Sequence, residues 1–264
     1  MTTTEKIDRA ATWLDNAHLN GDRYVPMPDD LRPVDIPEAY RVQQAFVARM
    51  AQRGRPSFGW KIALTAETMQ KMVNIDRPVG GTIVAPSLHE SPADLKASDF
   101  GRICFECEVA LRLGHDLHPD EGPFDMATIA DRVVAMAAAF EVADDRDADY
   151  TTLEAMSMIA DNAWNAGMVL GEVHRDVDPS GLPEATATLE IDGAEVGRGV
   201  GADAMGHPFN GLQFLADEMT AQGSTLKAGD WILTGTVIRT QFPKPGSELV
   251  YRHSLLGEVR ARVL

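Results

Sequence analysis

The stretch ICFECEVALRL, residues 103–113, decides how the rest of the chain has to fold around it. One set of alternate positions in it is apolar throughout, and this period of two is that of a β-strand rather than of a helix. In a strand, Glu106 and Glu108 lie on one face while Cys107 lies on the other. Cys104 also faces away from Cys107, so the two thiols are badly placed to share a zinc ion or to form a disulfide. We therefore interpret both cysteines as buried packing residues.

Glu106 and Glu108 are the residues of this strand that indicate chemistry. Their Cα atoms are expected roughly 6.5–7 Å apart on one face, so the two carboxylates repel each other. A solvent-exposed strand tolerates such a pair, whereas burial without a partner costs too much free energy. A bound divalent cation removes the conflict and suits ligands that are all oxygen. Glu141, directly after the apolar run 133–140, is the best third ligand, although its local sequence fits the exposed end of a helix equally well.

The composition limits the classes of function that the chain can have. Its 264 residues, 44% of them hydrophobic, suffice for one large domain or for a core with a smaller N-terminal part. The formal net charge of −16 repels nucleic acids and anionic membranes, so we expect neither as a partner. An anionic substrate would need a cation in its site. The N-terminus lacks an apolar signal core, and no run approaches the roughly 18–20 apolar residues of a membrane helix. We expect a soluble cytoplasmic protein.

Helices are predicted first along the chain and strands later. Apolar spacing predicts helices over residues 7–17, 36–50 and 66–75. Residues 54–65 are predicted to be a loop that enters a strand, and residues 76–86 a turn followed by a strand. From residue 101 onward, short runs between Gly, Pro and Asp predict strands over residues 103–113, 185–193, 194–201, 230–237 and 257–264. Two more helices are predicted over residues 126–139 and 207–223, the second with Gly223 as its cap. We therefore divide the chain into a helical N-terminal region, residues 1–58, and a strand-rich core, residues 59–264.

Seven sequence blocks carry a resemblance to a known family. They are GWKIALT (59–65), IDRPVGGTI (75–83), FECEVALRLGHDL (105–117), FEVADDR (140–146), IADNAWNAGMVLG (159–171), GHPFNGLQFLADEM (206–219) and LKAGDWILTGT (226–236). In this order and spacing they resemble the 2-keto-4-pentenoate hydratases and the related 4-oxalocrotonate decarboxylases of the fumarylacetoacetate hydrolase superfamily. The resemblance implies an α+β fold, with a mixed β-roll or sandwich core and a smaller helical N-terminal region.

The resemblance also implies roles for individual residues. It implies that Mg²⁺ or Mn²⁺ is bound by Glu106, Glu108 and Glu141. It implies catalytic roles for Lys61 and Asp161, and a substrate pocket that includes Asn162, Gly235 and Thr236. The substrate would be a small anionic 2-oxo acid, and the protein would assemble as a homo-oligomer.

We predict a hydro-lyase that adds water to a 2-hydroxy-2,4-dienoate, or to its 2-oxo-enoate tautomer, and forms a 4-hydroxy-2-oxo acid. A metal held by three carboxylates keeps positions open for such a substrate and stabilises its enolate. Lys61 would orient the 2-oxo oxygen or move a proton if burial and the metal lower its pKa, and a Schiff base at Lys61 ranks lower. Decarboxylation of a 2-oxo-3-enedioate is the second interpretation, and hydrolysis of an acylpyruvate is the third. An inactive, metal-stabilised scaffold subunit is the alternative outside enzymes.

Three positions depart from the family pattern. Val79 stands where the hydratases tend to carry an acidic residue, and this favours a decarboxylase or an uncharacterised branch of the family. Trp164 replaces a small polar residue, so it would either narrow the pocket or pack. His207 replaces the usual Asn before a late helix, and we predict a helix-capping role for it over a role in the pocket.

Overall fold

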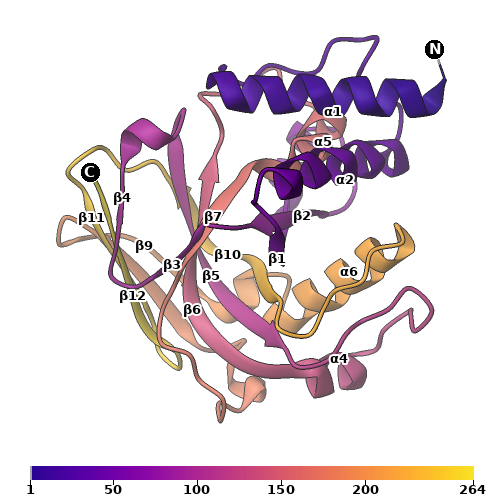
Figure 1. Ribbon diagram of the computed structural model, residues 1–264. Helices are drawn as coiled ribbons and strands as arrows, with labels where there is room; N and C mark the ends of the chain where they lie inside the picture. Colours follow the sequence, from indigo (N-terminus) through magenta and orange to yellow (C-terminus); the bar gives the residue numbers. More distant parts are fainter. Residues whose placement is uncertain (1) are drawn as a thin grey trace.

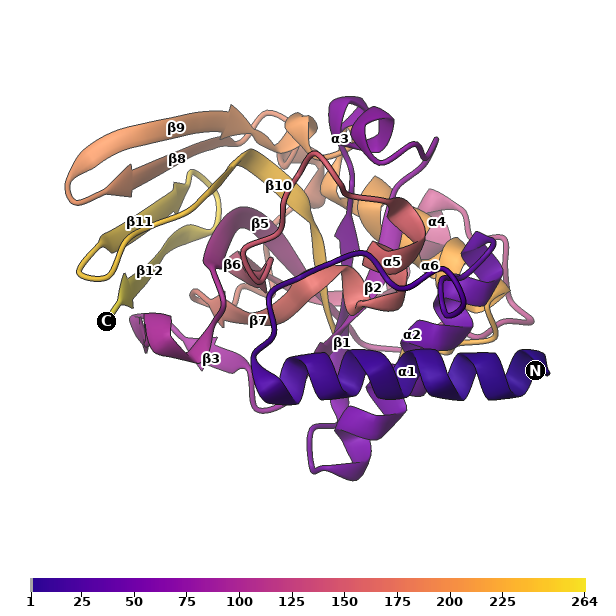
Figure 2. The same ribbon diagram turned by 90° about the horizontal axis from the view of Figure 1, so that it is seen from above.

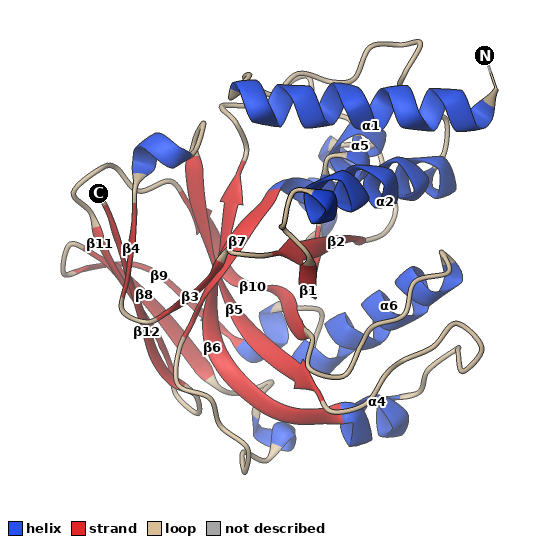
Figure 3. Cartoon of the chain, viewed as in Figure 1, coloured by secondary structure: helices blue, strands red, loops and turns tan. Residues whose placement is uncertain are grey.

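The computed structural model describes residues 2–264 and has an α+β fold (Figures 1 and 3). The α-helices are α1 (Thr3–Asn20), α2 (Ile36–Gln52), α3 (Glu67–Met72), α4 (Met126–Arg132), α5 (Ala155–Ala160) and α6 (Pro208–Ala221). The strands of the larger sheet are β1 (Ser57–Ala63), β2 (Val79–Val84), β3 (Leu88–Glu90), β5 (Ile103–Leu113), β6 (Val133–Asp144), β7 (Asn165–Leu170) and β10 (Trp231–Gln241). The strands of the smaller sheet are β4 (Ala93–Leu95), β8 (Thr186–Ile191), β9 (Ala194–Val200), β11 (Glu248–His253) and β12 (Gly257–Val263).

The predicted strand 103–113 is β5, at the centre of the larger sheet. That sheet has the order β2-β1-β10-β5-β6-β7-β3, and β2 also contacts β7, so the sheet curls toward a closed barrel. The smaller sheet, of order β4-β12-β11-β8-β9, packs against β6, β7 and β10 (Figure 1). One face of β5 therefore points into the curled sheet, and the other packs into the main hydrophobic core between the sheets.

The two N-terminal helices form a layer over one end of this sheet, and Figure 2 shows α1 running along the outside of the molecule. A capping box between Thr2 and Glu5 begins α1, and Asp35 caps α2. Their apolar faces share a cluster with Val84 of β2 and Ala160 of α5. The helices are thus joined to the core by packing rather than tethered by a linker, and the boundary at residue 58 stays a prediction.

The prediction of one helix over residues 126–139 is wrong. Helix α4 ends at Arg132, and residues 133–144 form the long strand β6 between β5 and β7. Alanine favours helices locally. Here, however, Ala137 and Ala139 lie inside the curled sheet while Phe140 packs into the main core, so both faces of the segment are buried. Tertiary burial overrides the local preference, and Glu141 is not the exposed end of a helix.

The other predicted elements are present with shifted ends, and α5, β3, β4, β7 and β11 were not predicted. Cys104 and Cys107 are buried free cysteines, as expected for packing residues. His207 caps α6, because its Nδ1 accepts a hydrogen bond from the Phe209 N–H at 2.9 Å. Within residues 2–264 we find no helix that has both the length and the apolar character needed to span a bilayer.

Candidate metal centre

Three glutamates meet inside the curled sheet. Glu106 of β5 lies directly opposite Glu141 of β6 in the antiparallel register, and Glu108 follows on the same face of β5. Each offers a carboxylate oxygen, and these oxygens all lie within 4.8 Å of one another. Glu108 and Glu141 are fully buried, while Glu106 is partly exposed. The structure thus brings together the three residues that were predicted to bind a metal.

Neighbouring strands hold one oxygen of each glutamate. The Gly235 N–H donates to Glu108 Oε2 at 2.8 Å, and the Thr240 hydroxyl donates to Glu106 Oε1 at 2.6 Å. The Asn165 amide donates to Glu141 Oε1 at 3.0 Å. The second oxygens of two of these glutamates, Glu108 Oε1 and Glu141 Oε2, are buried and have no hydrogen-bond partner.

The two unpartnered oxygens show that these residues fit a divalent cation. A buried carboxylate oxygen without a partner is costly, and a hard cation with all-oxygen ligands removes that cost. Burial and the neighbouring carboxylates raise the pKa of Glu108 well above its usual range. Burial, together with Glu106, raises the pKa of Glu141 to about 7, even though Lys61 opposes this shift. The cluster therefore has an excess of negative charge that one cation would compensate.

Lys61 of β1 lies against this cluster. Its Nζ is 3.0 Å from Glu141 Oε1 and donates to the Ala163 carbonyl at 3.4 Å, and the residue is only 3% exposed. Burial lowers the pKa of Lys61, but Glu141, Glu106 and Glu108 together more than offset this, so the pKa is raised. With the three glutamates as its neighbours, Lys61 is a buried cation, and a lowering of its pKa by a bound metal stays a prediction.

Asp161 lies elsewhere. Its Oδ1 is 2.6 Å from Nε2 of His18 on α1, and its Oδ2 accepts a hydrogen bond from the Arg146 side chain. Within residues 2–264, no hydrogen bond or ion pair joins Asp161 to Lys61 or to the glutamates. Asp161 therefore links the N-terminal helix to the core, and a catalytic role for it remains a prediction.

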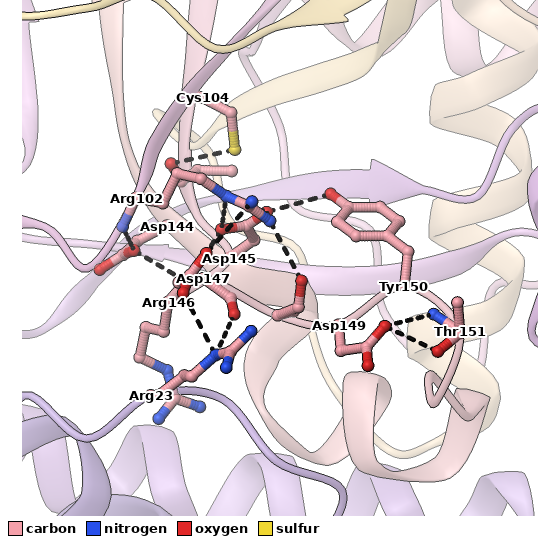
Figure 4. A network of polar contacts seen from close by, with 12 residues as sticks. Arg23, Arg102, Cys104, Asp144, Asp145, Arg146, Asp147, Asp149, Tyr150 and Thr151 are labelled. Atoms are coloured by element: carbon pink, nitrogen blue, oxygen red, sulfur yellow. Dashed lines mark hydrogen bonds and ion pairs between the residues drawn. The ribbon is translucent and has the colours of Figure 1, made fainter.

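Arg146 belongs to the turn after β6, whose polar contacts Figure 4 shows. Asp144 accepts hydrogen bonds from the N–H groups of Gly101, Arg102 and Arg146. The fully buried Asp145 accepts from the Arg102 side chain at 2.8 Å and from the Tyr150 hydroxyl at 3.2 Å. The acidic pair thus fixes the turn, which is not a solvated loop.

The polar groups of Asn162 and Thr236 are already used within the protein. The Asn162 side chain accepts from the Thr82 N–H and donates to the Thr82 carbonyl, both at 2.7 Å. The Thr236 hydroxyl accepts from the Cys107 N–H at 3.1 Å and donates to the Ile238 carbonyl at 2.6 Å. Asn162 and Thr236 thus stabilise the backbone around the site, and Gly235 holds Glu108. Direct substrate binding by these three residues remains a prediction.

Asn165 and Thr240 were not identified from the sequence. Asn165 begins a strand that the sequence did not predict, and Thr240 follows register shifts in the pairing of β10 with β5. No local pattern therefore shows that either side chain reaches a glutamate.

A cavity of about 520 Å³ opens beside this cluster. Its lining includes His18, Arg53, Arg55, Arg146, Trp164 and Asn165. Trp164 packs edge-on against Tyr24, with ring centroids 4.9 Å apart, and also forms part of the cavity wall. Because Asn165 contacts both the cavity and Glu141, the cavity reaches to within one side chain of the glutamates. Val79, in contrast, is buried in the main core.

Comparison with known proteins supports the resemblance seen in the sequence. The chain is 31% identical to a 2-keto-4-pentenoate hydratase of Burkholderia vietnamiensis over 99% of this chain and 98% of the relative. A solved 4-oxalocrotonate decarboxylase from Pseudomonas putida G7, complexed with magnesium and adipate, has a TM-score of 0.91 at 24% identity, covering 100% of this chain and 99% of the other. A fumarylpyruvate hydrolase from Pseudomonas aeruginosa, in complex with Mn²⁺ and pyruvate, has a TM-score of 0.60 at 15% identity, covering 80% and 89%.

These neighbours were solved with different divalent metals, and at these identities the two structural likenesses establish the fold. The family model described as fumarylacetoacetate (FAA) hydrolase C-terminal matches residues 41–264. Since that match covers most of the chain, the protein belongs to the fumarylacetoacetate hydrolase family.

Proposed function

We propose that the protein is a hydro-lyase dependent on Mg²⁺ or Mn²⁺, which hydrates a 2-hydroxy-2,4-dienoate to a 4-hydroxy-2-oxo acid. The observation that carries this proposal is the cluster of Glu106, Glu108 and Glu141, with its two unpartnered buried oxygens, beside the buried Lys61. A relative that is 31% identical over nearly the whole chain is a 2-keto-4-pentenoate hydratase.

The three glutamates would hold the cation, which, when bound, supplies positive charge next to the 2-oxo oxygen of the substrate. Lys61 is the second cation at this place and would donate a hydrogen bond to the same oxygen. In the first step the 2-hydroxyl proton is lost and a proton is added at C5, which gives the 2-oxo-3-enoate. Water then adds its hydroxyl group at C4 and its proton at C3. Lys61 Nζ would be the group that moves a proton in this first step.

The test follows the dienol absorbance of 2-hydroxypenta-2,4-dienoate with purified protein and Mg²⁺ or Mn²⁺, against an EDTA control. We expect metal-dependent loss of absorbance and formation of 4-hydroxy-2-oxopentanoate. Glu106→Gln and Glu108→Gln should abolish this activity, whereas Glu67→Gln, on the exposed surface of α3, should retain it. Unchanged activity in both Glu106→Gln and Glu108→Gln would rule out the proposed metal centre.

Decarboxylation of a 2-oxo-3-enedioate is the second candidate function. Val79 favours it, because an apolar residue in the main core cannot transfer the proton that an acidic residue would. The substrate would lose its distal carboxylate as CO₂ and leave the dienol, so release of CO₂ with accumulation of dienol absorbance distinguishes the two reactions. Pyruvate release from an acylpyruvate would instead indicate hydrolysis, for which His18, paired with Asp161 at the cavity wall, is the candidate base.

A homo-oligomeric assembly also remains a prediction, which analytical ultracentrifugation would test.

A further inference from the structure

Arg55, between α2 and β1, is a partly buried cation without a carboxylate partner. Its Nε donates to the Ala85 carbonyl at 3.2 Å, and within residues 2–264 no carboxylate lies within ion-pair distance of it. The two other arginines of the cavity wall differ, since Arg53 is paired with Asp15 and Arg146 with Asp161. The two terminal nitrogens of Arg55 therefore remain available to a ligand.

In the part of the chain that the structure describes, Arg55 is the arginine of the cavity wall whose charge no paired carboxylate balances. Burial and the nearby Arg53 lower the pKa of Arg55, in line with a guanidinium group that contacts a main-chain carbonyl and no carboxylate of residues 2–264. Two acids also line the cavity, but Asp144 accepts hydrogen bonds from three main-chain N–H groups, and Asp99 accepts one from Ser98. In a chain of net charge −16, an arginine left unpaired at a cavity wall is a place where an anionic group gains stabilisation.

The cavity that Arg55 lines also lies next to the glutamates. Asn165 lines it and donates to Glu141 at 3.0 Å, so a single side chain separates the cavity that Arg55 lines from the metal centre. Met50, Val84 and Phe100 line the same cavity and offer an apolar surface for a carbon chain. A substrate whose 2-oxo acid end lies at the glutamates would extend its far end into this space.

We propose that the cavity binds the far end of the substrate and that Arg55 binds a second carboxylate there. The natural substrate is then a dicarboxylate, a 2-oxo-enedioate or its dienol, rather than a monocarboxylate. The planar guanidinium group can bind a carboxylate through two parallel hydrogen bonds, which a lysine cannot do. This inference rests on the proposed function, because the glutamate cluster has to bind the 2-oxo acid end.

The first test measures binding rather than turnover. Isothermal titration with metal-loaded protein would compare 2-oxoheptane-1,7-dioate with 2-oxoheptanoate, which lack the double bond and are not hydrated. We expect the native protein to bind the dioate more tightly, by roughly 10- to 100-fold, because one charge-assisted interaction is gained. Arg55→Gln should lose this preference while its affinity for 2-oxoheptanoate stays unchanged. Arg55→Lys should keep only part of the preference. Arg41 is an exposed arginine on α2, so Arg41→Gln should bind both compounds as the native protein does.

The second test compares kcat/KM for 2-hydroxyhepta-2,4-diene-1,7-dioate and 2-hydroxyhepta-2,4-dienoate. A native preference for the dioate that Arg55→Gln abolishes would support the inference. Equal kcat/KM values in the native protein would overturn it while leaving the hydratase proposal intact. A preference that survives in Arg55→Gln would overturn the role of Arg55. If neither compound is turned over, the proposed function fails, and the binding measurement still decides whether Arg55 recognises a second carboxylate.

Discussion

Glu108 is a buried carboxylate with one oxygen held by Gly235 and the other unpartnered. Replacement by the isosteric Gln keeps an acceptor for the Gly235 N–H and removes a charge that Glu141 and Glu106 repel. We therefore expect Glu108→Gln to be as stable as the native protein, or more stable, in the absence of metal. A cation at 100 times its Kd stabilises a protein by about 2.7 kcal/mol, and this gain should disappear in the variant.

Thermal unfolding with EDTA and with Mn²⁺ measures both effects. Glu67→Gln, which removes an exposed glutamate, serves as the control and should keep the full gain from Mn²⁺. A Glu108→Gln protein that Mn²⁺ stabilises as much as the native protein would contradict the assignment of Glu108 as a ligand.

Lys61 places a positive charge next to the three glutamates, 3.0 Å from Glu141 Oε1. Lys61→Met should lower kcat by roughly 10²- to 10⁴-fold, the usual contribution of a group that moves a proton in the transition state. Metal affinity should be equal or higher, because a cation next to Glu141 has been removed. Lys71→Met, at an exposed position on α3, is the matched control. Titration with Mn²⁺ beside steady-state kinetics checks the prediction, and parallel loss of metal binding and activity would argue for a purely structural role of Lys61.

At the scale of elements, strand β10 contacts the metal centre through the N–H of Gly235, which donates to Glu108. Its φ of +103° is unfavourable for other residues, and a Cβ there would lie 2.9 Å from Cγ2 of Thr65. Gly235→Ala should therefore cost backbone strain of about 1–3 kcal/mol and also displace the N–H that holds Glu108. We expect lower stability and weaker Mn²⁺ binding.

Gly229→Ala separates these two effects. Gly229 has a similar φ of +92° but nothing within 4 Å of the added Cβ, so it should show the strain without the loss of metal affinity. Urea unfolding and Mn²⁺ titration of both variants are the measurements. Equal Mn²⁺ affinity in the two variants would mean that the Gly235 N–H does not position Glu108.

At the scale of the whole molecule, the smaller sheet makes stability depend on pH through His253 of β11. Burial lowers the pKa of His253 to about 4, and its Nε2 has no hydrogen-bond partner. The unfolded chain binds a proton at this residue below about pH 6.5, which the folded protein does not. The stabilisation is therefore complete above pH 6.5 and is lost as the pH falls toward 4.

Replacement of His253 by Asn should remove this dependence. Between pH 7 and pH 5 the native protein should lose on the order of 2 kcal/mol more unfolding free energy than His253→Asn. Urea unfolding at the two pH values measures the difference, with the exposed His118→Asn as control. The same pH dependence in the native protein and in His253→Asn would exclude His253 as its source.

The sequence alone determined what depends on local spacing. The alternation in residues 103–113 predicted β5, placed Glu106 and Glu108 on one face and separated the two cysteines, because the side-chain period of a strand is a property of the backbone itself. Together with the ordered blocks, it also indicated the family and the helical region before the core. The prediction of β5 holds because it needs only neighbours along the chain, whereas the family was indicated by the order of blocks spread over residues 59–236.

The tertiary structure alone decided which residues meet across the sheet. Residues 133–144 form a strand because both of their faces are buried, although their alanines favour a helix. In the folded chain, Asn165 and Thr240 reach the glutamates. Asp161 contacts His18, and Arg55 has no carboxylate partner among the described residues at the cavity wall. Such contacts depend on strand register and on the closure of the sheet, and residues far apart in the sequence set both of these together.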